Sequence, residues 1–251
     1  MPYIVAGSLK DLPPEIRAAL GAYRYEIFVR RLGWKLPTST GKLTAEWDEF
    51  DDGATVHVVA LSPARRVYGC ARLMPTTGRY LLKDVFPELL GSEPPPASTT
   101  LWELSRFAGT APKSHDRHAS EDGAPGMQLF AYALALAASF GATDVVGVVS
   151  RSIERLYRRS RLNLQRIYPD VTARNASIVA CSIELSPATF GQLGCNPHDL
   201  IKSVHWFGKL PLPNTTVAVN DAGSSRTPLL PQSMTKLRLA KSTGCAKRVD
   251  L

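Results

Sequence analysis

The segment Trp102-Glu103-Leu104-Ser105-Arg106-Phe107 places a carboxylate, a hydroxyl and a guanidinium between apolar residues that favour a buried strand. Because alternate side chains of a strand share a face, we expect Glu103 and Ser105 on one face. Leu104 and Arg106 are then expected on the opposite face. A buried charge is costly unless it is paired. The segment therefore predicts either a structural ion network or a functional site.

Two earlier segments contain the charged and aromatic residues that can serve as partners for this strand. The first runs Arg24-Tyr25-Glu26-Ile27-Phe28-Val29 and leads to Gly33-Trp34. The second is Glu46-Trp47-Asp48-Glu49-Phe50-Asp51. Both lie in the first fifth of the chain, so the sequence predicts that they fold against the later strand.

Hydrophobic periodicity outside these segments predicts both strands and helices. Further strands are expected at 55–61, 67–73, 145–149 and 177–185, and helices at 16–31, 127–140, 152–160 and after Ser186. This mixture indicates an α/β (α+β) fold, a central mixed sheet flanked by helices. We expect a single domain at 1–213, followed by a basic, flexible tail at 214–251 that has little apolar surface to bury.

The composition is that of an ordinary soluble globular protein, because 44% of the 251 residues are apolar. No apolar run approaches the roughly 20 residues needed to span a bilayer. The first residues lack the charged region and long apolar core of a signal peptide. We therefore expect a cytoplasmic protein without a membrane partner.

The cysteines and histidines predict neither a disulfide framework nor a metal site. The four cysteines are far apart and form no C-x-x-C pair. His115 and His118 have a ligand-like spacing, but they stand in a polar stretch without a third ligand nearby.

Positive charge is concentrated in two places. The chain has a formal net charge of +8, and residues 224–251 hold six basic residues against one acid. A second basic group lies on the helix expected around Arg151–Arg161. This helix face can be simply solvated, or it can bind an acidic protein. Nucleic acid is the less favoured partner, because no exposed aromatic residues are interleaved with the charges.

Ten positions resemble the pattern of the acyl-homoserine-lactone synthases, the LuxI-type autoinducer synthases of bacterial quorum sensing. In chain order these are Arg24, Phe28, Trp34, Asp48, Asp51, Arg72, Glu103, Ser105, Arg106 and Phe107. The resemblance covers roughly residues 1–210. A few extra residues between Trp34 and Asp48 depart from the pattern, and we expect them to lengthen a surface loop.

The resemblance implies a fold like the GCN5-type N-acetyltransferases and a two-substrate reaction. In that reaction, the α-amine of S-adenosylmethionine attacks an acyl thioester carried by acyl carrier protein or coenzyme A. The methionine carboxylate then displaces methylthioadenosine and closes the lactone. S-adenosylmethionine is thus a substrate, and no cofactor is implied.

The same resemblance assigns roles to the matched residues. Glu103, Ser105 and Arg106 are expected to be catalytic, with Glu103 as the base that accepts the amine proton, directly or through water. Asp48 is expected to bind the substrate ammonium. The other substrate-binding residues are expected to be Arg24, Phe28, Trp34, Asp51, Arg72 and Phe107. Gly147 and Val149 are expected to line the acyl pocket.

Four alternatives remain open from the sequence. Arg72 and Asp51 can form a structural ion pair without touching substrate, and Gly147 can serve only close strand packing. The letters Arg106-Phe107-Ala108-Gly109-Thr110-Ala111 also fit the R-x-x-G-x-A phosphate loop of acetyl-coenzyme A-dependent N-acetyltransferases. The alternative from a different functional class is a basic regulatory module that binds nucleic acid.

Overall fold

The computed structural model describes residues 3–34, 44–110, 125–167 and 177–211. The strands in these ranges are β1 (Tyr3–Gly7), β2 (Val56–Leu61), β3 (Val67–Pro75), β4 (Leu101–Gly109), β5 (Asp144–Ser150), β6 (Leu164–Arg166), β7 (Ile178–Glu184) and β8 (Val204–Phe207). The helices are α1 (Pro14–Arg24), α2 (Leu81–Asp84), α3 (Pro125–Ser139), α4 (Arg151–Arg159), α5 (Pro187–Gln192) and α6 (Pro197–Lys202). A π-helix, η1 (Tyr25–Arg31), continues α1, and a short 3-10 helix, η2 (Pro87–Leu89), follows α2.

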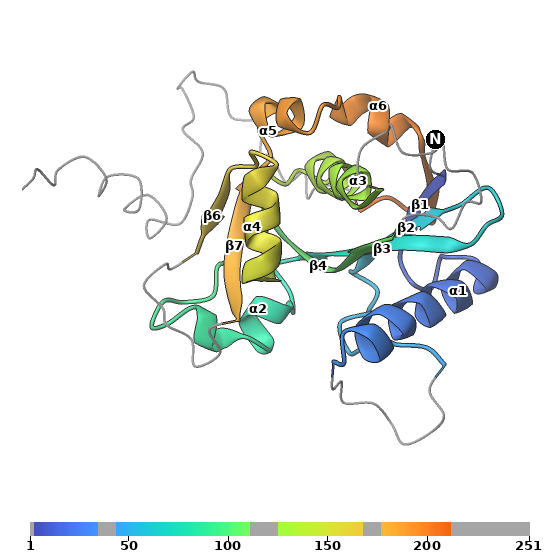
Figure 1. Ribbon diagram of the computed structural model, residues 1–251, viewed down its shortest axis with the longest axis horizontal. Coiled ribbons are helices and arrows are strands. Elements are labelled where there is room, and N and C mark those ends of the chain that lie inside the picture. The colour runs from blue at the N-terminus through green and yellow to red at the C-terminus, as the bar shows by residue number, and fades with distance from the viewer. Residues whose placement is uncertain (1–2, 35–43, 111–124, 168–176, 212–251) are drawn as a thin grey trace, which may run out of the picture. The chain divides into compact units, whose positions relative to one another are not determined.

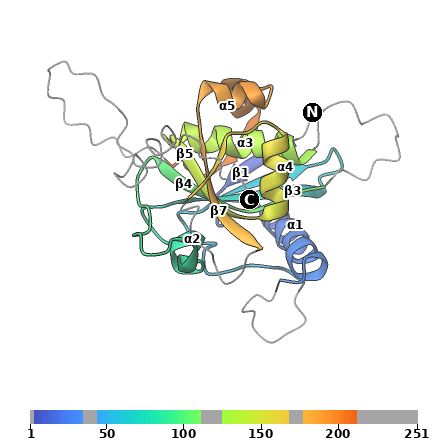
Figure 2. The ribbon, with the colours of Figure 1, turned by 60° about the vertical axis from the view of Figure 1, so that its left-hand side comes forward.

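These strands form one mixed sheet in the order β6-β7-β5-β4-β3-β2-β1-β8. The pairs β4–β5 and β1–β8 are parallel, and the other neighbours are antiparallel. Helices cover both faces, with α1 and α3 on opposite sides of the sheet (Figures 1 and 2). The predicted fold class, a central mixed sheet flanked by helices, is confirmed.

The alanine-rich helix α3 is the centre of the larger hydrophobic core. It packs on β3 and β4 with one side and against α6 with another, so residues from Leu129 through Ala137 are all buried. A sequence that is apolar on nearly all sides is expected for a helix covered in this way. A smaller core lies on the other face of the sheet and includes Leu20 and Phe28.

The elements absent from the sequence-based prediction are short: β1, α2, β6, α6 and β8. Each has at most six residues. Such segments span too few residues for a helical or strand period to be recognised. Strands β1 and β8 pair with each other, so their formation depends on contacts between the two ends of the described chain.

Strand β4 is irregular at its centre, and this irregularity shapes the site. Its parallel pairing with β5 covers only Leu101–Glu103. On its other edge, between the pairs Cys70–Ala108 and Arg72–Ser105, the single β3 residue Ala71 lies opposite two β4 residues, Arg106 and Phe107, which is a β-bulge. Arg106 belongs to this bulge, and its backbone φ of 46° lies in the left-handed region.

Helices α1–α6 all belong to one compact unit, Met1–Asn214. The predicted tail at 214–251 lies outside the described residues, so the predicted boundary stays a prediction. In the described part of the chain, no helix combines the length and apolar character needed to cross a bilayer.

Candidate active site

The site begins where α1 changes into a π-helix. Arg24 ends α1, and Phe28 lies one turn later in η1, where the N–H of Leu32 donates to the carbonyl of Ile27 at 3.0 Å. Such five-residue hydrogen bonds widen the turn and are frequent at functional sites. The side chains of Arg24 and Phe28 are buried, and Trp34 follows three residues after η1.

The acidic segment beginning at Glu46 packs closely against α1. The N–H of Glu46 donates to the carbonyl of Gly21 at 3.0 Å. A Cβ at Gly21 would lie 2.7 Å from the ring of Trp47, so the absence of a side chain there permits this approach. The carboxylates of the segment are thereby held beside the arginines of α1, β3 and β4.

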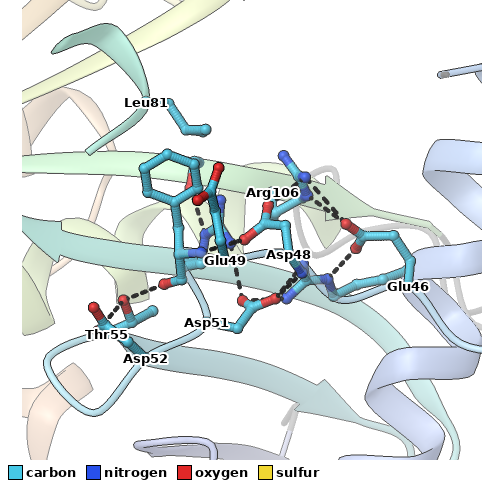
Figure 3. Close-up of polar contacts among 12 residues, drawn as sticks. Glu46, Asp48, Glu49, Asp51, Asp52, Thr55, Leu81 and Arg106 are labelled. Carbon is cyan, nitrogen blue, oxygen red and sulfur yellow. Dashed lines mark hydrogen bonds and ion pairs between the residues drawn. The ribbon is translucent and has the colours of Figure 1, made fainter. Parts of the chain in front are cut away.

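Six charged side chains form a closed ring in which arginines and acids alternate. Figure 3 labels four of them, Glu46, Asp48, Asp51 and Arg106. Their order is Arg24, Glu46, Arg106, Asp48, Arg72, Asp51 and back to Arg24. The ion pairs that close the ring have N–O distances between 2.5 and 3.0 Å. Three positive charges balance three negative ones, so each buried charge in this charge ring has partners on both sides.

Hydrogen bonds fix the geometry of the charge ring. Arg24 donates to both carboxylate oxygens of Asp51, at 2.8 and 3.0 Å, which is the strong bidentate arrangement. The N–H of Asp48 donates to the same carboxylate at 2.8 Å. Burial alone would raise the pKa of Asp51, but the charges of Arg24 and Arg72 outweigh it and hold the pKa well below its usual range.

Exposure divides the charge ring into an inner and an outer part. The side chains of Arg24, Arg72 and Glu46 are at most 1% exposed, whereas Asp48 is 13% exposed and Arg106 is 6% exposed. In this conformation the members that a substrate can reach are therefore Asp48 and Arg106. The inner members have the geometry of a scaffold.

Arg106 does not lie on the face that strand alternation predicts, and the prediction for this residue is wrong. Leu104 packs against the core around α3, as expected. Arg106, however, joins Ser105 on the opposite face, where it contacts Glu46 and Asp48. The cause is the β-bulge at Arg106, because an extra residue in a strand shifts the alternation by one position.

Glu103 lies outside the charge ring and is held by a helix N-terminus. Its two carboxylate oxygens accept hydrogen bonds from the N–H groups of Leu81 and Leu82, at 2.6 and 2.8 Å. Both donors belong to the first turn of α2, where backbone N–H groups have no partner within the helix. Burial raises the pKa of Glu103 to about 7 although these bonds act in the opposite direction.

Ser105 and Phe107 lie on opposite faces of β4. The hydroxyl of Ser105 accepts a hydrogen bond from Nε of Arg72 at 2.9 Å, so it supports the charge ring. The ring of Phe107 packs against Phe130 of α3, with 5.5 Å between the centroids. The structure therefore does not bring Phe107 together with the charged residues of its motif.

The two aromatic residues matched near the N-terminus stack on each other. The ring centroids of Phe28 and Trp34 are 4.8 Å apart. The guanidinium of Arg106 lies 5.6 Å from the first centroid and 5.3 Å from the second, within the range of cation–π attraction. Trp34 is 41% exposed, so this pair forms the outer wall of the site beside Arg106.

Gly147 lies in β5 at the point where β4 and β5 stop pairing. A Cβ at this position would lie 2.9 Å from the backbone carbonyl oxygen of Leu104. A backbone atom cannot move aside cheaply, so this contact favours the close-packing explanation for the glycine. Val149 is partly buried and packs against the core around α3.

Two residues of the site, Glu46 and His57, were not among the site residues predicted from the sequence. Glu46 is fully buried and joins Arg24 to Arg106 in the charge ring. His57 of β2 lies opposite Arg72 of β3, with Nε2 3.7 Å from Oδ1 of Asp51. Burial lowers the pKa of His57 to about 3, so the imidazole is neutral at pH 7. Glu46 belongs to the acidic segment 46–51. The aromatic residues that follow it in that segment are the sequence feature that could have indicated its burial.

The described residues give little support to the alternative hypotheses of a phosphate loop, a nucleic-acid-binding helix or a metal site. Arg106–Gly109 of the R-x-x-G-x-A match lie within β4, whereas a phosphate loop must open a helix. Glu154 of α4 pairs with Arg158 and Arg166, which neutralises part of the basic helix. No group of three metal-ligating side chains occurs in the described ranges, and His115 and His118 lie outside them.

Comparison with known proteins identifies the family. The model of the autoinducer synthase family matches residues 15–193. The chain is 42% identical to an acyl-homoserine-lactone synthase of Ralstonia solanacearum, over 73% of this chain and 89% of the relative. It is 37% identical to a synthase of Pseudomonas aeruginosa, over 71% and 84%.

Solved structures agree with the sequence comparison. The crystal structure of TofI in a ternary complex with an inhibitor and MTA is 36% identical, covers 78% of this chain and 98% of TofI, and has a TM-score of 0.62. The likeness to such synthases confirms the predicted GCN5-type N-acetyltransferase-like fold. The chain therefore belongs to the autoinducer synthase family, the acyl-homoserine-lactone synthases, which are acyltransferase enzymes.

Proposed function

We propose that the protein joins S-adenosylmethionine to an acyl thioester, forms an acyl-homoserine lactone and releases methylthioadenosine. The observation that carries this proposal is the buried Glu103 carboxyl, whose pKa is raised to about 7 beside the balanced charge ring. A base with a pKa near 7 is matched to proton abstraction at neutral pH. The MTA bound in the TofI complex supports the same choice of substrate.

The first proposed step forms the amide. The α-amine of S-adenosylmethionine attacks the thioester carbonyl, a C–N bond forms, the C–S bond breaks, and the carrier sulfur leaves as a thiolate with the electrons of that bond. Glu103 accepts the proton that the amine loses, directly or through one water. The developing oxyanion is stabilised by a backbone N–H near Ser105–Phe107, where the bulge of β4 frees backbone groups from pairing.

The second step closes the lactone. A carboxylate oxygen of the methionyl group attacks the adjacent Cγ, and the C–S bond to the sulfonium breaks. The sulfur keeps the bonding electrons and leaves as neutral methylthioadenosine. Loss of the sulfonium charge makes this leaving group favourable. S-adenosylmethionine thus acts as a substrate, and the reaction needs no other cofactor or metal.

The outer members of the charge ring are proposed to bind S-adenosylmethionine. Asp48 is the acid nearest to solvent, so its carboxylate can accept a hydrogen bond from the substrate ammonium. The Phe28–Trp34 pair can cover the adenine or face the sulfonium. Arg24, Arg72 and Asp51 are proposed to act indirectly, because their charges already satisfy one another.

The direct test is product analysis with purified protein. S-adenosylmethionine and a panel of acyl-carrier-protein and acyl-coenzyme A thioesters are supplied, and both products are followed by mass spectrometry. We expect methylthioadenosine and an acyl-homoserine lactone in equal amounts. Consumption of thioester without methylthioadenosine would refute the synthase reaction and favour a simple acetyltransferase.

For the acyl donor we propose acyl carrier protein, docked on the outer face of α4. Arg151, Arg155 and Arg159 are exposed on this helix together with Leu156, which is 49% exposed. A basic face around an apolar residue is complementary to an acidic carrier protein. The reaction is then cytoplasmic, where acyl carriers and S-adenosylmethionine are both present.

The docking proposal predicts a difference between carriers. The substitution Arg155→Glu should raise KM for acyl-carrier-protein thioesters and leave KM for acyl-coenzyme A unchanged. Arg17→Glu, on the distant helix α1, serves as the matched charge reversal. Equal effects of Arg155→Glu on both thioesters would contradict docking of the carrier at α4.

A further inference from the structure

Arg79 connects two parts of the protein that hold different catalytic groups. Its Nη2 lies 2.9 Å from the carboxylate of Glu49, in the acidic segment of the charge ring. Its Nε lies 3.3 Å from the carboxylate of Asp84, in α2. Its guanidinium also lies 5.0 Å from the centroid of the Phe50 ring. One side chain thus contacts both the acidic segment and the helix that holds Glu103.

The contact continues from Phe50 into the charge ring. The guanidinium of Arg72 lies 5.9 Å from the centroid of the same aromatic ring, so Phe50 is close to both arginines. The N–H of Phe50 donates to Oδ1 of Asp48 at 2.9 Å. Arg79 is therefore linked to the substrate-facing acid of the charge ring through Phe50.

The ion pair between Arg79 and Asp84 likewise links Arg79 to Glu103, through helix α2. Asp84 lies in the four-residue helix whose first N–H groups, those of Leu81 and Leu82, hold the Glu103 carboxylate. A helix this short gains little stability from its own hydrogen bonds, so it depends on outside contacts. Arg79 supplies one of these contacts.

We propose that Arg79 is a positioning residue that fixes α2, and with it the Glu103 carboxylate, relative to the acidic segment carrying Asp48. The proposal rests on the proposed function, in which Glu103 accepts the proton and Asp48 binds the ammonium. Arg79 itself is 54% exposed and touches neither group. It acts on both through Phe50, Glu49 and Asp84.

The charges around Glu103 give the proposal a distinctive signature. Burial raises its pKa, the N–H groups of α2 and the charge of Arg72 lower it, and the charge of Asp84 raises it. Arg79 is the partner of Asp84. Loss of Arg79 leaves the Asp84 charge uncompensated and loosens the N–H groups of α2, and both changes raise the Glu103 pKa. Loss of the Asp84 charge lowers it.

The experiment measures the ionisation of Glu103 in two ways. The pH dependence of kcat/KM is recorded for the wild type, Arg79→Gln, Arg79→Lys and Asp84→Asn. The same pKa is measured directly by ¹³C NMR of glutamate labelled at the side-chain carboxyl, with the Glu103 signal assigned from its absence in Glu103→Gln. Arg66→Gln is the control, because Arg66 is an exposed arginine in the turn between β2 and β3.

We expect Arg79→Gln to raise the Glu103 pKa, and Asp84→Asn to lower it, each by roughly 0.2–0.7 pH unit, the size of an exposed pair interaction. Arg79→Lys keeps the charge and should restore most of the wild-type pKa. Arg66→Gln should match the wild type. Arg79→Gln should also lower kcat several-fold while KM for S-adenosylmethionine changes less.

A Glu103 pKa that is the same in Arg79→Gln, Arg66→Gln and the wild type would overturn the positioning role. So would shifts of the same sign in Arg79→Gln and Asp84→Asn, which a general loosening of the fold would produce. The NMR measurement needs no turnover. If the wild type released no methylthioadenosine, the proposed function would fail, and the NMR shifts would still decide whether Arg79 positions Glu103.

Discussion

At Glu103, burial and hydrogen bonding act on the carboxyl pKa in opposite directions. Burial disfavours the charged carboxylate, and the N–H groups of Leu81 and Leu82 favour it. Burial prevails, and the pKa reaches about 7. The same α2 contacts that limit this rise also hold the carboxylate in place. A group with these properties can accept a proton at neutral pH and release it afterwards.

This balance predicts the pH dependence of the reaction. A general base must be unprotonated, so kcat/KM should rise with pH up to about 7 and then level off. Glu103→Gln keeps the shape and removes the proton acceptor, so it should lower kcat far more than it changes KM for S-adenosylmethionine. Steady-state kinetics from pH 5 to 9 measures both. A Glu103→Gln variant with wild-type turnover would make the residue part of the scaffold.

The same pKa also predicts how the stability of the fold changes with pH. The folded state holds the Glu103 proton up to about pH 7, whereas the unfolded chain releases it near 4.5. Between these values the folded state binds more protons, so the contribution of Glu103 to the free energy of unfolding falls as pH rises. Urea unfolding at pH 5 and pH 7.5 should show that Glu103→Gln removes this decrease. An identical pH slope in both proteins would contradict the raised pKa.

Arg24 is expected to support the fold rather than touch the substrate. Its removal leaves the carboxylates of Glu46 and Asp51 buried without their partner, at a cost of about 3–5 kcal/mol. We predict that Arg24→Met lowers the urea midpoint by a corresponding amount. Arg30→Met, which breaks one exposed pair with Glu26, should cost about 0.5 kcal/mol or less. Equal stability of the two variants would contradict the scaffold assignment.

At the scale of elements, strand β4 brings the catalytic candidates together by breaking its own regularity. A regular strand would place Arg106 beside Leu104, in the apolar core. The bulge turns Arg106 into the charge ring and leaves Phe107 on the α3 face. The π-helix η1 similarly changes the regular spacing of α1, and Phe28 then contacts Trp34.

The junction of β4 and β5 predicts a stability effect at Gly147. A methyl group there meets the carbonyl oxygen of Leu104, so Gly147→Ala should destabilise the fold by about 1–3 kcal/mol. Gly191→Ala is the matched control, because a Cβ at Gly191 meets nothing within 4 Å. Thermal unfolding of both variants tests this. A Gly147→Ala protein as stable as the control would mean that the strands separate easily.

Gly147 also bears on the choice of acyl group. Gly147 is expected to line the acyl pocket, and a glycine offers no side-chain hydroxyl that could donate to a 3-oxo group. A keto oxygen buried without a partner costs about 1–3 kcal/mol. We therefore predict that the protein prefers an unsubstituted, medium-length acyl group. Competition between unsubstituted and 3-oxo thioesters of equal length measures this, and a clear preference for the 3-oxo donor would contradict it.

At the scale of the whole molecule, the described elements already contain the sheet, the charge ring and Glu103. The family match ends at residue 193, and the predicted tail lies beyond it. We predict that a protein truncated after residue 213 keeps its kcat and its unfolding temperature. A truncated protein that folds but releases no methylthioadenosine would show that residues 214–251 take part in the reaction.

The sequence by itself determined the fold class, the longer strands and helices, and the residues that belong to the family pattern. These features depend on local periodicity and on motif spacing, which are visible along the chain. The sequence also identified the three segments that meet in the site. Short elements such as α2 were not predicted, because they are stabilised by contacts rather than by their own composition.

Only the tertiary structure decided how the charges pair. The sequence offers several possible acidic partners for each of the three arginines of the charge ring. Which acid pairs with which arginine depends on where α1, β3 and β4 lie in space. The structure added Glu46 and His57 to the site and separated buried charges from reachable ones. The structure also showed that a β-bulge places Arg106 on the face of the charge ring, and no residue type in the segment predicts this bulge. Electrostatic partners depend on distances between remote segments, and those distances are fixed by packing of the whole fold.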